Sequence, residues 1–179
     1  MEPKLAFFDV DGTLSAPCYE HAPGKNLIGV SDEDWLAFLE REGEDAYKDC
    51  APLPCVRDYA KYLKGKGLRL FVLSSSASET ESAAKIKFLR AHYDGLFEDF
   101  FFTAHDSEKL DVIRRESEKA AVLPAQCVFV EDTYRTLLSA STEGIICIHV
   151  ANIIVGNCTE YGVTKHNAAE AGTPDPDQA

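Results

Sequence analysis

The sequence has little positive charge compared with its negative charge. Lys and Arg total 18 against 30 Asp and Glu, so the formal net charge is −12. This balance disfavours a nucleic-acid partner, because binding to a phosphate backbone needs a cationic surface. It equally disfavours an anionic membrane surface. Small anions stay compatible with it, since one loop and one metal ion can hold a phosphate group whatever the net charge.

Long hydrophobic runs and paired cysteine motifs are also missing. No apolar run approaches the roughly 20 residues of a transmembrane helix, and the first residues lack the layout of a secretory signal. The six cysteines show no C-x-x-C spacing, and Cys127 and Cys147 lie inside apolar runs. Reduced thiols acting as small hydrophobes are therefore expected, rather than disulfides or a zinc site. These absences favour a cytoplasmic protein.

The 179 residues are enough for one main domain with a modest insertion. Short apolar runs predict buried strands, and segments with helical periodicity separate them. The runs are 5–8, 68–73, 100–103, 127–130 and 145–150. Helices that alternate with near-continuous apolar strands predict an α/β fold, a three-layer Rossmann-like parallel sheet of five main strands with helices on both faces.

One stretch after the first strand interrupts this alternation. It contains a single clear helix, which the capping-box pair Ser31 and Asp34 begins and Gly43 ends. The last residues of the chain have too little apolar character to join a core. The predicted division is an α/β core at 1–14 and 55–163, a small helical cap insertion at 15–54, and a C-terminal tail at 164–179.

Polar residues follow the predicted strands, at the edge where an open parallel sheet binds its ligands. Asp9 follows the first strand, Ser74 the second, and Glu131 with Asp132 the fourth; Lys109 lies a few residues beyond the third. Converging carboxylates with a hydroxyl and an ammonium indicate a site for a metal ion and a phosphate. The carboxylates suit a hard cation such as Mg²⁺, and the hydroxyl and ammonium suit phosphoryl oxygens.

The strongest local signal is the segment 9–13, with the sequence DVDGT. If Asp9 ends a strand, the chain then turns away and brings both acids to one cavity. Gly12 is expected to let backbone N–H groups approach an anion closely. An EF-hand calcium loop beginning at Asp9 is excluded, because the glycine that its sixth position requires is Leu14 here.

In type, order and strand position these residues resemble the four motifs of the haloacid dehalogenase superfamily, over about residues 4–150. The first motif is highly specific and the fourth fairly so, while single serine and lysine matches are weak alone. The resemblance implies a phosphoric monoester hydrolase in which Asp9 forms an aspartyl-phosphate. Asp11 protonates the leaving oxygen and later activates water. Because the dehalogenase, phosphonate-hydrolase and cation-pump branches lack this second acid, its presence favours phosphate esters.

The same resemblance implies the ligand sets. Mg²⁺ is expected on the Asp9 carboxylate, the Asp11 backbone carbonyl and the Asp132 carboxylate, with Glu131 beside the ion or bound through water. Thr136 stands where many members carry a further acid, and the Glu-Asp-Thr sequence resembles the Glu-Asp-Ser of the β-phosphoglucomutase branch. The expected catalytic residues are Asp9, Asp11, Ser74 and Lys109, and the expected phosphate contacts are Gly12, Thr13, Ser74, Ser75 and Lys109.

Two other lysines compete with Lys109 for the phosphate-binding position. Lys85 and Lys87 both lie inside the predicted helix that leaves Ser74, which is the less suitable place. Lys109 is instead predicted to begin the helix after the third strand, so it is preferred.

The insertion bears on the substrate and on the oligomeric state. Its 40 residues, counted from 15 to 54, are fewer than a full helical cap, so the site is either open or completed by a partner subunit. Monomer and homodimer both stay open. The polar candidates for the rim are Cys18, Tyr19, His21, Lys25 and Lys48.

The function expected from these features is Mg²⁺-dependent hydrolysis of a small-molecule phosphate ester. A phosphomutase or phosphotransferase of the same superfamily is an alternative, which the small cap disfavours because transfer requires exclusion of water. A non-catalytic module that binds phosphate or Mg²⁺ is a second alternative. The presence of Asp9, Asp11 and Lys109 argues against it.

Overall fold

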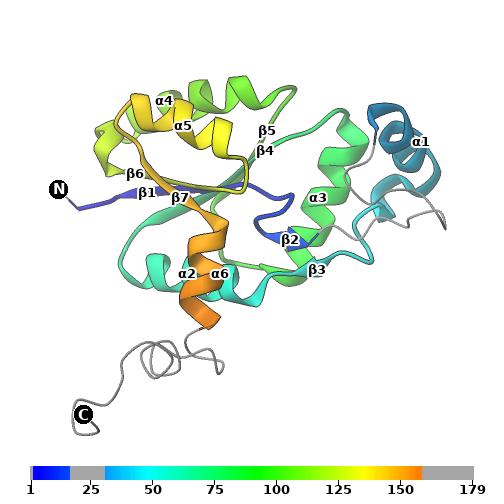
Figure 1. Cartoon of the computed structure of the whole chain (residues 1–179), viewed down its shortest axis with the longest axis horizontal. Coiled ribbons are helices and arrows are strands. Elements are labelled where there is room, and N and C mark those ends of the chain that lie inside the picture. Colours follow the sequence, from blue (N-terminus) through cyan, green and yellow to red (C-terminus); the bar gives the residue numbers. More distant parts are fainter. Residues whose placement is uncertain (1, 17–30, 159–179) are drawn as a thin grey trace, which may run out of the picture.

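The computed structural model describes residues 2–16 and 31–158, which form a five-stranded parallel sheet between two layers of helices (Figure 1). The spatial order is β5-β4-β1-β6-β7, with every neighbouring pair parallel. The predicted α/β fold and its five strands are confirmed. The strands are β1 (Leu5–Phe8), β4 (Arg69–Ser75), β5 (Asp99–Thr103), β6 (Cys127–Glu131) and β7 (Ile146–His149).

Strand β1 lies at the centre of the sheet, and all four of its side chains are buried. Leu5 and Phe7 pack in a cluster with α4 (Lys109–Lys119) and α5 (Tyr134–Thr142). Ala6 and Phe8 pack in a second cluster with α2 (Pro54–Gly65), α3 (Glu79–His92) and α6 (Val150–Cys158). Figure 1 shows α4 and α5 on one side of the sheet and α2 and α6 on the other. Because helices cover both faces of the sheet, the strand sequences consist mostly of consecutive apolar residues.

Local capping signals in the sequence set several helix starts. The Ser78 hydroxyl accepts from the Glu81 backbone N–H at 3.1 Å, so α3 begins where the capping box predicts. Ser31 caps α1 (Asp32–Glu42) in the same way, accepting from the N–H of Asp34 at 3.1 Å. Lys109 is the first residue of α4, as predicted. Between 31 and 158, no helix is long and apolar enough to span a membrane.

The described part of the insertion packs beside α3. Besides α1 it contains the short 3₁₀ helix η1 (Gly43–Asp45) and the strand β3 (Ala51–Pro52), which pairs antiparallel with β2 (Ser15–Ala16). Figure 1 shows α1 next to α3, at one end of the sheet. This two-stranded pair was not predicted, because two residues are too few to show a period. Further 3₁₀ turns are η2 (Asp106–Glu108) and η3 (Pro124–Gln126).

Some predicted features lie outside the described residues. They are the rim candidates Cys18, Tyr19, His21 and Lys25 and the tail at 164–179. The remaining rim candidate, Lys48, binds the Glu42 carboxylate at 3.0 Å on an exposed surface. The domain boundaries and the role of the insertion as a cap stay predictions.

The structure shows Cys55, Cys127 and Cys147 as free thiols. Cys50 and Cys127 are buried, while Cys55 and Cys147 are partly buried. Burial raises the pKa of the Cys127 thiol to about 11. These side chains therefore act as small hydrophobes in the packing.

Candidate active site

Three carboxylates and one ammonium meet where β1 and β6 end. Asp9 directly follows β1, Glu131 is the last residue of β6, and Asp132 comes next. One carboxylate oxygen from each of these acids lies within 4.8 Å of the others. The Lys109 Nζ lies 2.9 Å from Asp9 Oδ1 and 2.8 Å from Glu131 Oε2. The structure therefore brings together four side chains that the sequence predicted at this edge.

The acids in this cluster are crowded and mostly removed from solvent. Burial, helped by the charge of Glu131, raises the pKa of Asp9 to about 7 although Lys109 opposes the shift. Burial likewise raises the pKa of Glu131 to about 7. For Lys109, burial alone would lower the pKa, but Asp9 and Glu131 outweigh it and hold it raised. When ionised, the three carboxylates exceed the single ammonium in charge, and their oxygens are the ligands that a divalent hard cation takes.

Gly12 shows how closely the chain packs around Asp132. Its φ is +73°, and a Cβ at this position would lie 2.2 Å from Asp132 Oδ2. The N–H groups of Gly12 and Thr13 donate within the turn, to the carbonyls of Ser15 and Val10 at 2.9 and 3.2 Å. The glycine therefore makes room for Asp132. The approach of N–H groups to an anion stays a prediction.

Thr13, one of the predicted phosphate contacts, has a side-chain hydroxyl without a hydrogen-bond partner among the described residues. Thr13 Oγ1 is buried. A buried hydroxyl normally has a partner. Its lack of one is compatible with the predicted contact between Thr13 and a ligand.

Both oxygens of Glu131 are already occupied. Oε2 accepts from Lys109, and Oε1 accepts from the backbone N–H groups of Asp132 and Thr133 at 3.1 and 3.0 Å. These bonds fix the turn that presents Asp132. Glu131 thus suits a place beside a metal ion, with Asp9 and Asp132 as the nearer carboxylates.

Asp11 belongs to a second polar centre, held by a different lysine. Its Oδ2 lies 2.7 Å from Lys85 Nζ, and its Oδ1 accepts from the Tyr47 hydroxyl at 2.6 Å. Two acids that are two residues apart in the sequence therefore have separate cationic partners. Asp9 is 4% exposed, whereas the side chain of Asp11 is 34% exposed and reaches toward solvent.

The serine after the second strand joins the Asp11 centre. Ser74 is buried inside β4, and its Oγ lies 3.3 Å from Lys85 Nζ. The neighbouring Ser75 offers its carbonyl to the same ammonium at 2.5 Å. Among the competing lysines, Lys109 contacts Asp9 as predicted, Lys85 contacts Ser74 and Asp11, and Lys87 is exposed and binds Asp45 at 2.7 Å.

Sequence reasoning missed three members of these two centres. Asp106 Oδ1 binds Lys109 Nζ at 2.9 Å, and Glu81 Oε1 binds Lys85 Nζ at 2.8 Å. Their spacings, three and four residues along a helix, are the signal that predicts such pairs. The contact between Tyr47 and Asp11 spans 36 residues and has no local signal.

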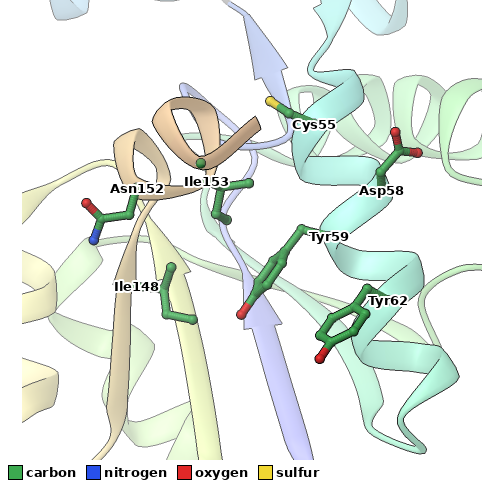
Figure 2. A pocket seen from close by; sticks show the side chains of 8 residues that line it. Cys55, Asp58, Tyr59, Tyr62, Ile148, Asn152 and Ile153 are labelled. Atoms are coloured by element: carbon green, nitrogen blue, oxygen red, sulfur yellow. The ribbon is translucent and has the colours of Figure 1, made fainter. Parts of the chain in front are cut away.

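One pocket of the described residues lies near the acidic cluster, and another lies between two helices. One of about 550 Å³ adjoins the acidic cluster, since Asp106 and Thr133 are among its lining residues, together with Ser107, Leu110, Arg135, Thr136 and Ser139. A more apolar pocket of about 490 Å³ lies between α2 and α6, and Figure 2 shows Tyr59 and Tyr62 facing Ile148 and Ile153 across it. Its lining includes no member of the acidic cluster.

Comparison with known proteins gives matches to solved structures alone. No family model matches the chain, and no curated protein sequence matches it. A haloacid dehalogenase-superfamily hydrolase of subfamily IA from Geobacter sulfurreducens superposes with a TM-score of 0.55 at 15% identity, over 82% of this chain and 86% of that one. A protein described as a predicted phosphoglycolate phosphatase from Haemophilus somnus gives 0.54 at 17% identity, over 83% and 84%.

A magnesium complex of a haloacid dehalogenase family enzyme from Bacteroides thetaiotaomicron also gives a TM-score of 0.55, at 13% identity over 83% of this chain and 93% of that one. These identities are too low to carry an activity across. They show a shared architecture, and it is the one that the sequence motifs predicted. The chain therefore has the α/β fold of these solved structures, which are described as haloacid dehalogenase-type enzymes and a predicted phosphatase.

Proposed function

We propose that the chain is a Mg²⁺-dependent phosphatase that hydrolyses a small-molecule phosphate monoester through an aspartyl-phosphate on Asp9. The observation that carries the proposal is the separation of the two acids of the first motif. Asp9 is buried against Lys109, while Asp11 is partly exposed and held by Tyr47 and Lys85. One acid is thus fixed as a nucleophile, and the other is free to exchange a proton near solvent.

The metal ion would be held by the carboxylates of Asp9 and Asp132 and by the Asp11 backbone carbonyl, with Glu131 beside it. The clustered carboxylate oxygens and the space that Gly12 leaves for Asp132 support this assignment. A bound Mg²⁺ would supply positive charge to offset the phosphoryl oxygens and the nucleophile. One structure with the same fold, from Bacteroides thetaiotaomicron, is a magnesium complex.

The reaction follows from the two acids. An Asp9 oxygen attacks phosphorus, the bond from phosphorus to the leaving oxygen breaks, and the Asp11 carboxyl gives its proton to that oxygen. Water then attacks phosphorus and gives a proton to Asp11, and cleavage of the bond to Asp9 releases phosphate and restores its carboxylate. Lys109 holds the Asp9 carboxylate in place. The proposal assigns a phosphoryl contact to Ser74, whose Oγ lies 3.3 Å from Lys85 Nζ.

The proposal is tested by hydrolysis of p-nitrophenyl phosphate with and without Mg²⁺. We expect Mg²⁺-dependent turnover that Asp9→Asn abolishes, and a phosphoryl group on Asp9 in acid-quenched wild-type protein analysed by mass spectrometry. Asp94→Asn is the matched control, because it makes the same change at an exposed position. Absence of turnover with retained Mg²⁺ binding would indicate a binding module instead. Transfer of phosphate to an added alcohol in preference to water would indicate a phosphotransferase.

A further inference from the structure

The Asp11 carboxylate has a hydrogen-bond donor on each oxygen, and the two donors come from different parts of the fold. Tyr47, just after η1 in the insertion, donates to Oδ1 at 2.6 Å. Lys85, on α3, lies 2.7 Å from Oδ2. A carboxylate held on both oxygens is fixed in its plane as well as in its position.

Lys85 is itself held firmly, unlike a lysine on a surface. It is 1% exposed, and its Nζ lies 2.8 Å from Glu81 Oε1 and 2.5 Å from the Ser75 carbonyl, in addition to Asp11. Burial alone would lower its pKa, but Asp11 and Glu81 outweigh burial and raise it. The Lys85 ammonium therefore stays charged and stays in one place.

Glu81 in turn links this lysine to the insertion. Its Oε2 accepts from the Ala77 backbone N–H at 2.8 Å and from the Trp35 indole N–H at 3.3 Å. Trp35 lies on α1, and its ring meets the ring of Tyr47 edge-on at 6.2 Å. The polar contacts thus run from the insertion through α3 to the catalytic edge of the sheet.

Tyr47 reaches Asp11 because its ring is packed on α3. The residue is 3% exposed, and its ring centroid lies 6.2 Å from that of Phe88. Nearby, Lys87 binds Asp45 at 2.7 Å and joins η1 to the same helix. The Tyr47 hydroxyl is therefore held near Asp11 by a segment of the insertion that packs against α3.

We propose that Tyr47 and Lys85 are positioning residues that aim the Asp11 carboxyl at the leaving oxygen of the substrate. The proposal rests on the phosphatase function proposed above. Asp11 must lie within hydrogen-bond reach of the departing oxygen to give its proton. Removing one of the two donors frees the carboxyl to turn, so proton delivery becomes less effective while attack by Asp9 is unaffected.

This division of labour makes a specific kinetic prediction for Tyr47→Phe. The value of kcat/KM reports the steps up to departure of the first leaving group, so it excludes the later attack by water. The p-nitrophenolate group leaves readily without a proton, whereas the phenolate of phenyl phosphate is far more basic and depends on Asp11. We expect kcat/KM for phenyl phosphate to fall about 10-fold or more, which is part of the roughly 10²- to 10⁴-fold rate increase that a general acid contributes. We expect kcat/KM for p-nitrophenyl phosphate to fall less than about 3-fold.

Tyr93→Phe is the matched control. The Tyr93 hydroxyl is also buried, donating to the Leu14 carbonyl and accepting from the Leu53 N–H at 3.2 Å, but it does not contact Asp11. This variant should lower the melting temperature and leave the ratio of the two kcat/KM values unchanged. Lys85→Gln, which keeps an N–H donor without the charge, is the second variant and should shift the ratio in the same direction as Tyr47→Phe.

The outcomes separate the two proposals. The positioning role would be overturned, and the phosphatase proposal left intact, by either of two results. In one, kcat/KM falls equally for both esters in a folded Tyr47→Phe protein. In the other, Tyr93→Phe shifts the ratio of the two kcat/KM values as much as Tyr47→Phe does. If wild-type protein turned over neither ester with Mg²⁺, the phosphatase proposal itself would fail. A larger fall for phenyl phosphate in both Tyr47→Phe and Lys85→Gln supports the positioning role.

Discussion

The substitution Gly12→Ala tests whether the acidic cluster is a metal site. A Cβ at position 12 would lie 2.2 Å from Asp132 Oδ2, and contacts under 3.0 Å are essentially never seen, so this oxygen must retreat by at least 3.0 − 2.2 = 0.8 Å. An alanine at a φ of +73° also strains the backbone by roughly 1–2 kcal/mol. The strain affects folding in general, whereas the displacement of Asp132 affects the cluster.

A matched variant separates these two effects. Gly144 has a φ of +79°, but no atom lies within 4 Å of its Cβ position, so Gly144→Ala carries the strain without the collision. In EDTA both variants should lose a similar free energy of unfolding. At roughly 2–4 °C per kcal/mol for a chain of this size, each should melt about 2–8 °C below wild type.

Magnesium should then distinguish them. At a concentration of 100 times its dissociation constant, a ligand stabilises the folded state by about 2.7 kcal/mol. If displacement of Asp132 weakens binding about 100-fold, at the upper end of the effects seen around metal ligands, the same concentration gives only about 0.4 kcal/mol. Wild type and Gly144→Ala should therefore gain about 5–11 °C on adding Mg²⁺, and Gly12→Ala about 1–2 °C.

Thermal unfolding followed by circular dichroism, with and without Mg²⁺, measures these differences directly, and calorimetric titration gives the affinities. A Gly12→Ala protein that gains as much from Mg²⁺ as Gly144→Ala would refute the reasoning, because it would show that the position of Asp132 does not matter to the ion. Failure of all three proteins to respond would refute the metal site altogether.

Three further predictions follow from the electrostatics. The pKa values of Asp9 and Glu131 are raised to about 7, so the metal-free folded protein keeps protons that the unfolded chain loses at lower pH. Its melting temperature should therefore fall as the pH rises from about 5 to 8. Mg²⁺ should reduce this fall, and its binding should release protons that calorimetry detects in buffers of different ionisation enthalpy. Lys109→Met leaves Asp9 and Glu131 without this cation and should lower the free energy of unfolding in urea by about 3–5 kcal/mol at pH 8, but by less at pH 5. Lys61→Met, at an exposed position, should leave the free energy of unfolding unchanged at both pH values. Because the pKa of Cys127 is raised to about 11, this thiol should resist alkylation in native protein at pH 8 and react after unfolding, as peptide mass spectrometry would show.

The central fold could be predicted because its signals are local. Each strand of the sheet contains a short apolar run, and the capping pairs beginning at Ser31 and Ser78 place two helix starts. Parallel strands bring their carboxyl ends to one edge, which is why Asp9 and Glu131 could be expected to meet from positions more than 100 residues apart. The helix α6 was not predicted, because the mostly apolar stretch that begins it shows no clear amphipathic period.

The second polar centre could not be predicted, because its contacts depend on how the insertion docks. Tyr47 has an unremarkable sequence context and reaches Asp11 only after η1 packs against α3. Lys85 was considered as an alternative to Lys109, but the structure gives it a different partner. The crowding of Gly12 by Asp132 was also not predicted, since Asp132 lies far along the chain. Long-range packing decides these details, and periodicity does not report it.

The turn after β1 explains why two neighbouring acids face different lysines. The backbone N–H groups of residues 13, 14 and 15 all donate to the Val10 carbonyl, so the chain bends sharply immediately after Asp9. Asp9 therefore stays with the sheet and with Lys109, while Asp11 is carried toward α3 and the insertion. In the proposed mechanism, changes in how the insertion docks should therefore affect proton transfer by Asp11 more than attack by Asp9. The proposed function therefore predicts that substitutions in the insertion change the preference for leaving groups while Asp9 and Asp132 keep their places beside the sheet.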